Sequence, residues 1–173
     1  MKTGFISLIG RPNAGKSTLL NQILERKIAI VSAKPQTTRT RITGIFTTPD
    51  VQMVFVDTPG IHKPKHHLDQ YMQEAATSSI YDGDVIYYVV DASVPFGGGE
   101  QFILDQLAKI EAPVFLLLNK IDMMTPEEIM RAIVKWQSRR EFAEIFPLSA
   151  ERGDNVDRLI ETTKGYLFDG PNF

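Results

Sequence analysis

The chain has 173 residues, 43% of them hydrophobic and 23% charged, with a formal net charge of -2. The composition is typical of a globular protein, and the length suits one domain and is short for two. This charge is not typical of a domain that binds nucleic acid over a broad basic surface, so any RNA contact is expected to be local. The lack of cysteine excludes disulfides and thiolate metal sites, and because the sequence shows neither an 18-residue apolar run nor a secretory signal, we expect a cytoplasmic protein.

The first half of the chain predicts a strand, a glycine-rich loop and a helix, followed by a hairpin. Apolar residues at helical spacing follow the loop, and a three-residue connection at 48–50 has the length of a hairpin turn. The polar segment 32–41 has no periodicity and is interpreted as an exposed loop. The predicted elements are strands over 5–9, 42–47 and 51–56, a short apolar run at 28–31, helices over 16–24 and 69–80, and an irregular segment over 61–67.

The second half alternates strands and helices. Thr125 and Glu128 flank Pro126 in the pattern of a capping box at the start of one of these helices. The predicted strands cover 85–90, 114–118 and 143–147, and the predicted helices cover 100–110, 126–138 and 156–167. This alternation predicts a three-layer α/β fold with a six-stranded sheet, five strands parallel and the strand over 42–47 antiparallel, with ligands at the carboxyl ends of the strands.

The stretch Gly10-Arg11-Pro12-Asn13-Ala14-Gly15-Lys16-Ser17 fits the pattern G-x-x-x-x-G-K-[ST] between a predicted strand and a predicted helix. Glycines let such a loop wrap an anion, and backbone N–H groups and the helix N-terminus then point at a β-phosphate. Lys16 adds a mobile positive charge for the β- and γ-oxygens, and Ser17 offers a hydroxyl to Mg²⁺. A glycine-rich turn that only caps a helix is the structural alternative.

Three further motifs stand at the ends of predicted strands. Asp57-Thr58-Pro59-Gly60 places a carboxylate where it can reach Mg²⁺ through water, and the Gly60 N–H where it can meet a γ-phosphate. In Asn119-Lys120-Ile121-Asp122, the Asp122 carboxylate can accept two hydrogen bonds from guanine, the Lys120 stem can lie along the base, and Asn119 can tie neighbouring loops together. Ser149-Ala150 is placed for a backbone N–H to guanine O6.

These four motifs resemble the signature set of translation-factor-type P-loop GTPases. Their surroundings, 35–39, 57–64 and 75–79, resemble the Era family closely over essentially the whole chain. The resemblance implies the P-loop NTPase, small G-protein fold and a switch that binds GTP and GDP with Mg²⁺. The implied nucleotide-binding residues are Asn13, Ala14, Gly15, Lys16, Ser17, Thr18, Asn119, Lys120, Asp122, Ser149 and Ala150, and the implied metal ligands are Ser17, Thr38 and Asp57.

The resemblance also implies how hydrolysis is catalysed. Lys16, Gly60, Asn13 and Thr38 are the implied catalytic residues, with Thr37 as an alternative to Thr38 for closing on Mg²⁺. Ile61 stands where Ras-type switches have a glutamine that orients water, so a low intrinsic rate is expected. In related GTPases an asparagine at the position of Asn13 helps to hold K⁺, with carbonyls that would correspond to residues 32 and 34. A purely structural hydrogen bond from Asn13 is the alternative.

Family knowledge further implies partners. Era-type GTPases act in small-subunit assembly and bind ribosomal RNA through a C-terminal KH domain, for which this chain has no G-x-x-G loop. We expect a GTPase domain over 1–168 and the start of a linker over 169–173, with RNA and ribosome contacts weakened here, peripheral membrane association as a family property, and a monomer. Two alternatives stay open: a nucleotide-gated binding module with negligible hydrolysis, and a related GTPase of tRNA modification.

Overall fold

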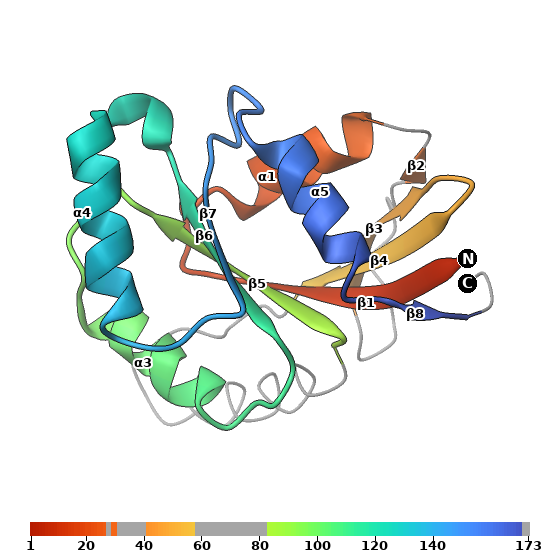
Figure 1. Ribbon diagram of the computed structural model, residues 1–173, viewed down its shortest axis with the longest axis horizontal. Helices are drawn as coiled ribbons and strands as arrows, with labels where there is room; N and C mark the ends of the chain where they lie inside the picture. The colour runs from red at the N-terminus through yellow and green to blue at the C-terminus, as the bar shows by residue number, and fades with distance from the viewer. Residues whose placement is uncertain (27–28, 31–40, 58–82, 171–173) are drawn as a thin grey trace.

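The computed structural model describes residues 1–26, 29–30, 41–57 and 83–170, which form one α/β unit (Figure 1). The predicted helix over 69–80 and the predicted irregular segment over 61–67 lie outside the described residues. The elements are β1 (Lys2–Ile9), α1 (Lys16–Glu25), β2 (Ala29–Ile30), β3 (Arg41–Thr47), β4 (Val51–Asp57), β5 (Val85–Asp91), α3 (Gly98–Leu107), β6 (Val114–Asn119), the 3-10 turn η1 (Ile121–Met123), α4 (Pro126–Gln137), β7 (Glu144–Pro147), α5 (Val156–Lys164) and β8 (Phe168–Asp169).

The strands form one sheet in the order β2-β3-β4-β1-β5-β6-β7. Strands β4, β1, β5, β6 and β7 run parallel, and β3 pairs antiparallel with β4 as the predicted hairpin. The predicted α/β class with a mostly parallel sheet is therefore confirmed. The central strands are apolar on both sides, as expected for a sheet that helices cover on both faces.

The predicted count of six strands is too low, because two short strands join the sheet. Strand β2 pairs antiparallel with β3, and β8 pairs antiparallel with the first residues of β1, where Lys2 lies opposite Asp169. Strand β5 pairs only with the later residues 6–9 of β1, so β8 occupies the adjoining part of the same edge. Two-residue strands carry no periodicity, and only tertiary context specifies them.

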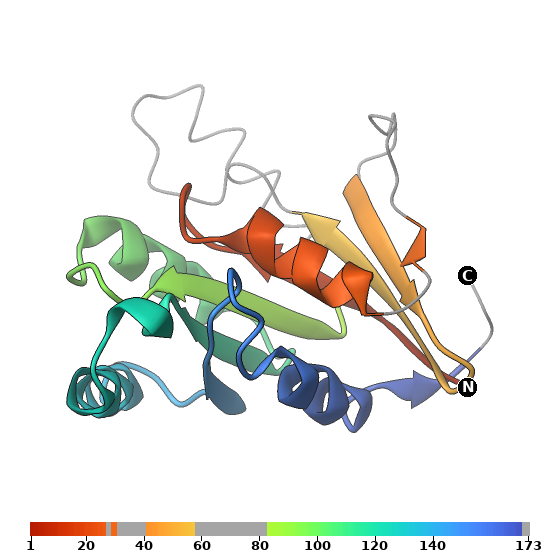
Figure 2. The ribbon, with the colours of Figure 1, turned by 90° about the horizontal axis from the view of Figure 1, so that it is seen from above.

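The described helices cover the sheet in two pairs, and in the view of Figure 2 helix α1 lies in front of the central strands. Helices α1 and α5 contact each other on one face and share a core with inward residues of β1, β4, β5 and β6. A second core joins α3 and α4 to the other face, and Trp136, the single tryptophan, lies in it at 6% exposure. Helix α4 begins with the predicted capping box, in which the Thr125 hydroxyl accepts from the Glu128 N–H at 3.2 Å.

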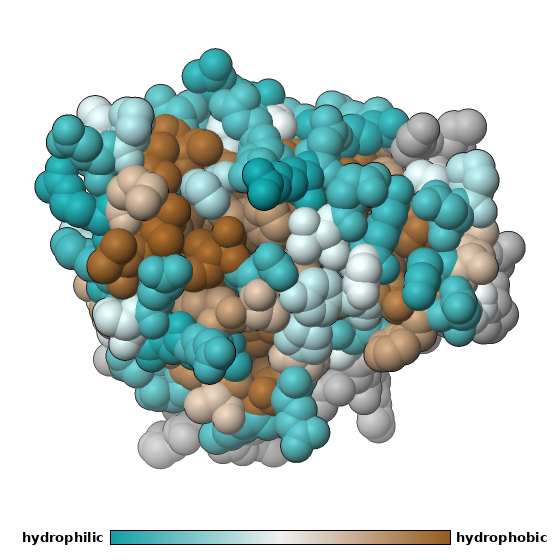
Figure 3. Space-filling view, in the orientation of Figure 1, coloured by the Kyte–Doolittle hydropathy of each residue, from teal (hydrophilic) through white to brown (hydrophobic). Residues whose placement is uncertain are grey.

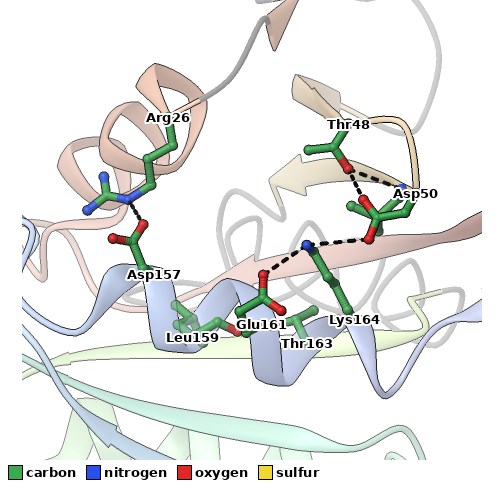
Figure 4. Close-up of polar contacts among 9 residues, drawn as sticks. Arg26, Thr48, Asp50, Asp157, Leu159, Glu161, Thr163 and Lys164 are labelled. Carbon is green, nitrogen blue, oxygen red and sulfur yellow. Dashed lines mark hydrogen bonds and ion pairs between the residues drawn. The ribbon is translucent and has the colours of Figure 1, made fainter.

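Helix α5 is shorter than predicted. It ends at Lys164 because the chain then turns into β8 rather than continuing helically to residue 167. Figure 4 shows how polar contacts hold it: Asp157 pairs with Arg26 at the end of α1, and Lys164 lies 3.7 Å from Asp50 in the β3–β4 turn. The predicted helix over 100–110 likewise shifts to Gly98–Leu107 as α3.

Apolar side chains gather on the surface where α4 lies in Figure 1 (Figure 3). The most exposed apolar side chains of this region are those of Met123, Met130 and Val134, at 67%, 60% and 60%. Among the described helices, none is both long and apolar enough to cross a membrane.

Candidate functional site

The sequence motifs converge where parallel strands end. Strand β1 leads into Gly10, β4 ends at Asp57, and β5 and β6 end at Asp91 and Asn119, which lie opposite each other in the sheet register. Carboxyl ends of adjacent parallel strands form the crevice in which α/β proteins bind ligands. As expected, the described residues of the motifs lie together at one edge of the sheet.

The loop after β1 needs glycine at both of its ends. A Cβ on Gly10 would lie 2.5 Å from the Val89 carbonyl oxygen, so the loop could not approach β5 as closely. Gly15 has φ +105° and a Cβ there would lie 2.1 Å from Nδ2 of Asn119. Both positions therefore exclude a side chain, and the motif's glycines are explained by close packing as well as by loop shape.

Neither a side-chain cap nor an acidic residue in the first turn compensates the helix dipole at the start of α1. Gly15 is its N-cap and makes no side-chain cap, and the first turn holds no acidic residue. The exposed helix N–H groups and the helix dipole therefore favour an anion at this end. Lys16, Ser17 and Thr18 line a cavity of about 470 Å³ here, together with Asn13 of the loop. The arrangement fits phosphate groups.

Asp57 fits the role of a metal-site carboxylate. Its Oδ1 is buried and receives no hydrogen bond within the described residues, while Lys16 Nζ lies 3.6 Å away. A buried carboxylate oxygen without a donor suits a water or a hard cation such as Mg²⁺. Ser17 lines the phosphate-side cavity in the same region, so both expected Mg²⁺ ligands in the described part lie close to the phosphate end of the site.

Asn119 ties two loops together, as its motif predicts. The side chain is 2% exposed, its Nδ2 donates to the Ala14 carbonyl at 2.8 Å, and its Oδ1 accepts from the Ala150 N–H at 2.9 Å. The phosphate-side loop and the loop after β7 are thus joined through one buried amide.

Lys120 is held by a carboxylate that the motifs did not include. Its Nζ lies 2.9 Å from Asp91 Oδ2 and donates to the Asn13 carbonyl at 3.0 Å. Burial disfavours ionisation of Asp91, but hydrogen bonds from Ser93 and Lys120 outweigh it and lower the pKa of Asp91. An acidic residue at the end of an apolar strand, like Asp57, was the signal that sequence reasoning passed over.

A smaller cavity of about 170 Å³ adjoins the first, and the base-recognition motif lines it. Asp122 is exposed there, and its Oδ1 accepts from the Ser149 hydroxyl at 2.8 Å. Gly15 and Thr18 line it as well, so the two cavities share one wall. A carboxylate at this place can accept the paired N–H donors of guanine.

The expected backbone donor to guanine O6 is not free in this arrangement. The Ser149 N–H donates to the Asp154 carbonyl at 3.2 Å, and the Ala150 N–H donates to Asn119 Oδ1. The reason is local: residues 149–154 close into a tight loop, which Arg26 supports by donating to the Gly153 carbonyl at 3.2 Å. Sequence reasoning gave Arg26 no role.

Several expected site residues lie outside the described part of the chain. They are Thr37, Thr38, Gly60 and Ile61, together with Ser32 and Lys34, so the closing threonine and the potassium-binding carbonyls stay predictions. Asn13 is described: it is exposed and has φ 69°.

Both the sequence and the structure of this chain are similar to those of known proteins. Residues 5–120 match the sequence model of the family described as 50S ribosome-binding GTPase. Era in complex with MgGDPNP and nucleotides 1506-1542 of 16S ribosomal RNA is similar, with 37% identity, a TM-score of 0.82 and coverage of 100% of this chain and 59% of that chain.

Two other solved structures are also similar. A single-residue variant of Aquifex aeolicus Era bound to GDP.AlF4- has 36% identity and a TM-score of 0.80, with coverage of 99% of this chain and 59% of that chain. Elongation factor SelB from Methanococcus maripaludis, in complex with GPPNHP, has 22% identity and a TM-score of 0.71, with coverage of 99% and 36%. The latter likeness shows the fold alone, and the chain spans 59% of each Era chain.

Proposed function

Because the chain belongs to the 50S ribosome-binding GTPase family, we propose that it is a guanine-nucleotide switch that hydrolyses GTP slowly and acts in small-subunit assembly. The observation that carries the nucleotide part is the pair of adjoining cavities, one beside an uncapped helix N-terminus with Lys16 and one beside Asp122. The first suits phosphates and the second suits guanine, and they share a wall, as one nucleotide requires.

The side chains of the two cavities divide between phosphate, base and metal binding. Lys16 and the loop N–H groups stabilise the charge that spreads over the phosphoryl oxygens during transfer. Asp122 accepts hydrogen bonds from the guanine edge, and Lys120, fixed by Asp91, flanks the base. Ser17 and Asp57 would hold Mg²⁺, which when bound would offset phosphate charge, and Thr37 or Thr38 would close on it.

The proposed slow rate follows from Ile61, since an aliphatic side chain cannot orient water by hydrogen bonding. Asn13 then supplies a means of stimulation. It is exposed beside the phosphate-side cavity, and its amide oxygen, with backbone carbonyls, is a ligand type that suits K⁺.

The ribosomal part of the proposal is supported by similarity to Era. The Era of 37% identity is bound to MgGDPNP and to nucleotides 1506-1542 of 16S ribosomal RNA. We propose that this chain provides the switch for an RNA contact of that kind. We also propose that it is a cytoplasmic monomer that associates with membranes only peripherally.

Hydrolysis of GTP in K⁺ and in Na⁺ at equal ionic strength, with ATP in parallel, tests the proposal. We expect slow hydrolysis of GTP, none of ATP, and a faster rate in K⁺ that Asn13→Ala abolishes without loss of GTP binding. Asn21→Ala, an exposed asparagine on α1, is the matched control and should leave the rate unchanged. Equally low rates in both salts would refute potassium stimulation and favour the nucleotide-gated binding module.

Base recognition is tested separately with Asp122→Asn. The carboxylate accepts two N–H bonds, whereas an amide offers one acceptor and one donor. We therefore expect the variant to prefer xanthine nucleotides over guanine nucleotides in competition binding. Unchanged GTP preference would refute the assignment of Asp122.

A further inference from the structure

A third cavity, of about 490 Å³, lies apart from the nucleotide site. It is bounded by the loop that follows β5 and by one flank of α4, where Trp136 and Phe96 contribute to the wall. Its volume is in the range of cavities that bind ligands. None of the residues proposed above to bind nucleotide lines it.

The described side chains around this cavity carry an excess of positive charge. Arg131, Lys135 and Arg139 line it from successive turns of α4 and its C-terminal end, and Glu128 is the one acidic residue among the lining side chains. Glu128 is engaged in the capping box, where it accepts from the Thr125 N–H at 2.9 Å. The chain as a whole carries a net charge of -2, so the cationic row stands out against an acidic protein.

The aromatic surface of the cavity is already covered. The Arg139 guanidinium lies 3.9 Å from the centre of the Phe96 ring and 4.8 Å from that of Trp136, and the two rings meet edge-on at 5.4 Å. Trp136 is only 6% exposed. Bases of single-stranded RNA need open aromatic faces on which to stack, so the wall favours a ligand recognised by charge and aliphatic contact.

The spacing of the cations indicates the shape of that ligand. Residues four apart on a helix are separated by about 6 Å along its axis. Alternate residues of an extended peptide are about 6.6 Å apart and point to the same side. Carboxylates at alternate positions of an extended segment can therefore meet Arg131 and Lys135 in turn, with charge-assisted hydrogen bonds to each. Arg139, just beyond the end of α4, lines the same cavity and offers a third cation.

We propose that this cavity is a docking groove for an acidic, extended segment of a partner protein. Its alternating carboxylates pair with the three cations of the groove, and an aliphatic residue that flanks the acidic run contacts the apolar wall at Ala132 and Met124. The loop that forms the opposite wall begins at Ala92, whose N–H donates to the Asn119 carbonyl at 3.0 Å, so the groove adjoins the nucleotide site through the backbone.

The test uses the whole 173-residue chain and a fluorescein-labelled synthetic peptide with three glutamates at alternate positions followed by leucine. Binding is followed by anisotropy and, with unlabelled peptide, by the fluorescence of Trp136, the single tryptophan. The double variant Arg131→Glu/Lys135→Glu is expected to weaken binding at least ~10-fold, and a peptide with glutamine in place of glutamate should bind as weakly.

The matched control is Lys109→Glu/Arg158→Glu, which makes the same change of net charge at exposed positions elsewhere. It should change the dissociation constant by less than ~2-fold, and circular dichroism checks that both variants fold. Equal weakening by both variants would overturn the groove in favour of long-range attraction. Absence of peptide binding, or tighter binding of an oligouridylate of the same length, would also overturn it, the latter in favour of RNA.

Discussion

Replacing Asn119 by alanine should destabilise the fold even without nucleotide. The buried amide donates to the Ala14 carbonyl and accepts from the Ala150 N–H. Alanine removes both bonds and leaves the Ala150 N–H without its acceptor in a place that water reaches poorly. The variant therefore tests whether the two loops are held together by the protein itself rather than by the nucleotide.

The magnitude follows from the cost of unpaired buried groups. Each such donor or acceptor costs about 1–3 kcal/mol, so the two groups left unpaired predict a loss of roughly 2–6 kcal/mol in the free energy of unfolding. With a urea m-value of about 2 kcal/mol/M, the unfolding midpoint should fall by roughly 1–3 M.

Urea unfolding of the nucleotide-free protein, followed by Trp136 fluorescence, measures this shift. Trp136 lies in the core on the side of α3 and α4, so it reports global unfolding. Asn21→Ala, at an exposed helix position, should leave the midpoint within ~0.3 M of the unmodified protein. A shift of Asn119→Ala that is no larger than this control would refute the reasoning.

Three further predictions concern single contacts. Gly15→Ala places a Cβ 2.1 Å from Asn119 Nδ2 at a φ of +105°, so it should lower the urea midpoint. The double variant with Asn119→Ala should lose less free energy of unfolding than the two single variants together, and strict additivity would contradict the clash. Thr125→Ala removes the cap of α4 and should lower the Tm by about 2–4 °C, for a loss of ~1 kcal/mol, and an unchanged calorimetric Tm would mean that the cap contributes nothing. Burial raises the pKa of the Glu100 carboxyl, which accepts a hydrogen bond from the Tyr88 hydroxyl, so ionisation of this carboxyl lowers the stability of the fold as pH rises through the raised pKa. Glu100→Gln should therefore be more stable than the unmodified protein at pH ~7 and lose this advantage below about pH 4. Equal urea midpoints of the two proteins at both pH values would disprove it.

Much of the fold was predictable because its signals are local. Apolar runs before the motifs predict β1, β4 and β6, and the capping box at Thr125 places the start of α4 within one residue. The meeting of Lys16, Asp57 and Asn119 also follows from the sequence, since each stands at or just after the carboxyl end of a parallel strand.

What escaped prediction depends on partners distant in the chain. Strand β8 exists only because the first residues of β1 leave an edge open beside β5. The Ala150 N–H is engaged by Asn119, and a two-residue motif carries no sign of that. Asp91 becomes a site residue only once its strand lies beside β6, where it meets Lys120.

The placement of β1 has a consequence for biosynthesis. Strand β1 pairs with β4, β5 and β8, whose residues are made about 50, 80 and 165 positions after its own. The sheet centre therefore cannot close while the chain is being elongated through its middle, and the β1 edge stays partly open until β8 has been made. A nascent chain of this protein therefore carries an apolar, incompletely paired strand for most of the synthesis of these residues, and that strand is open to non-native pairing until its partners have been made.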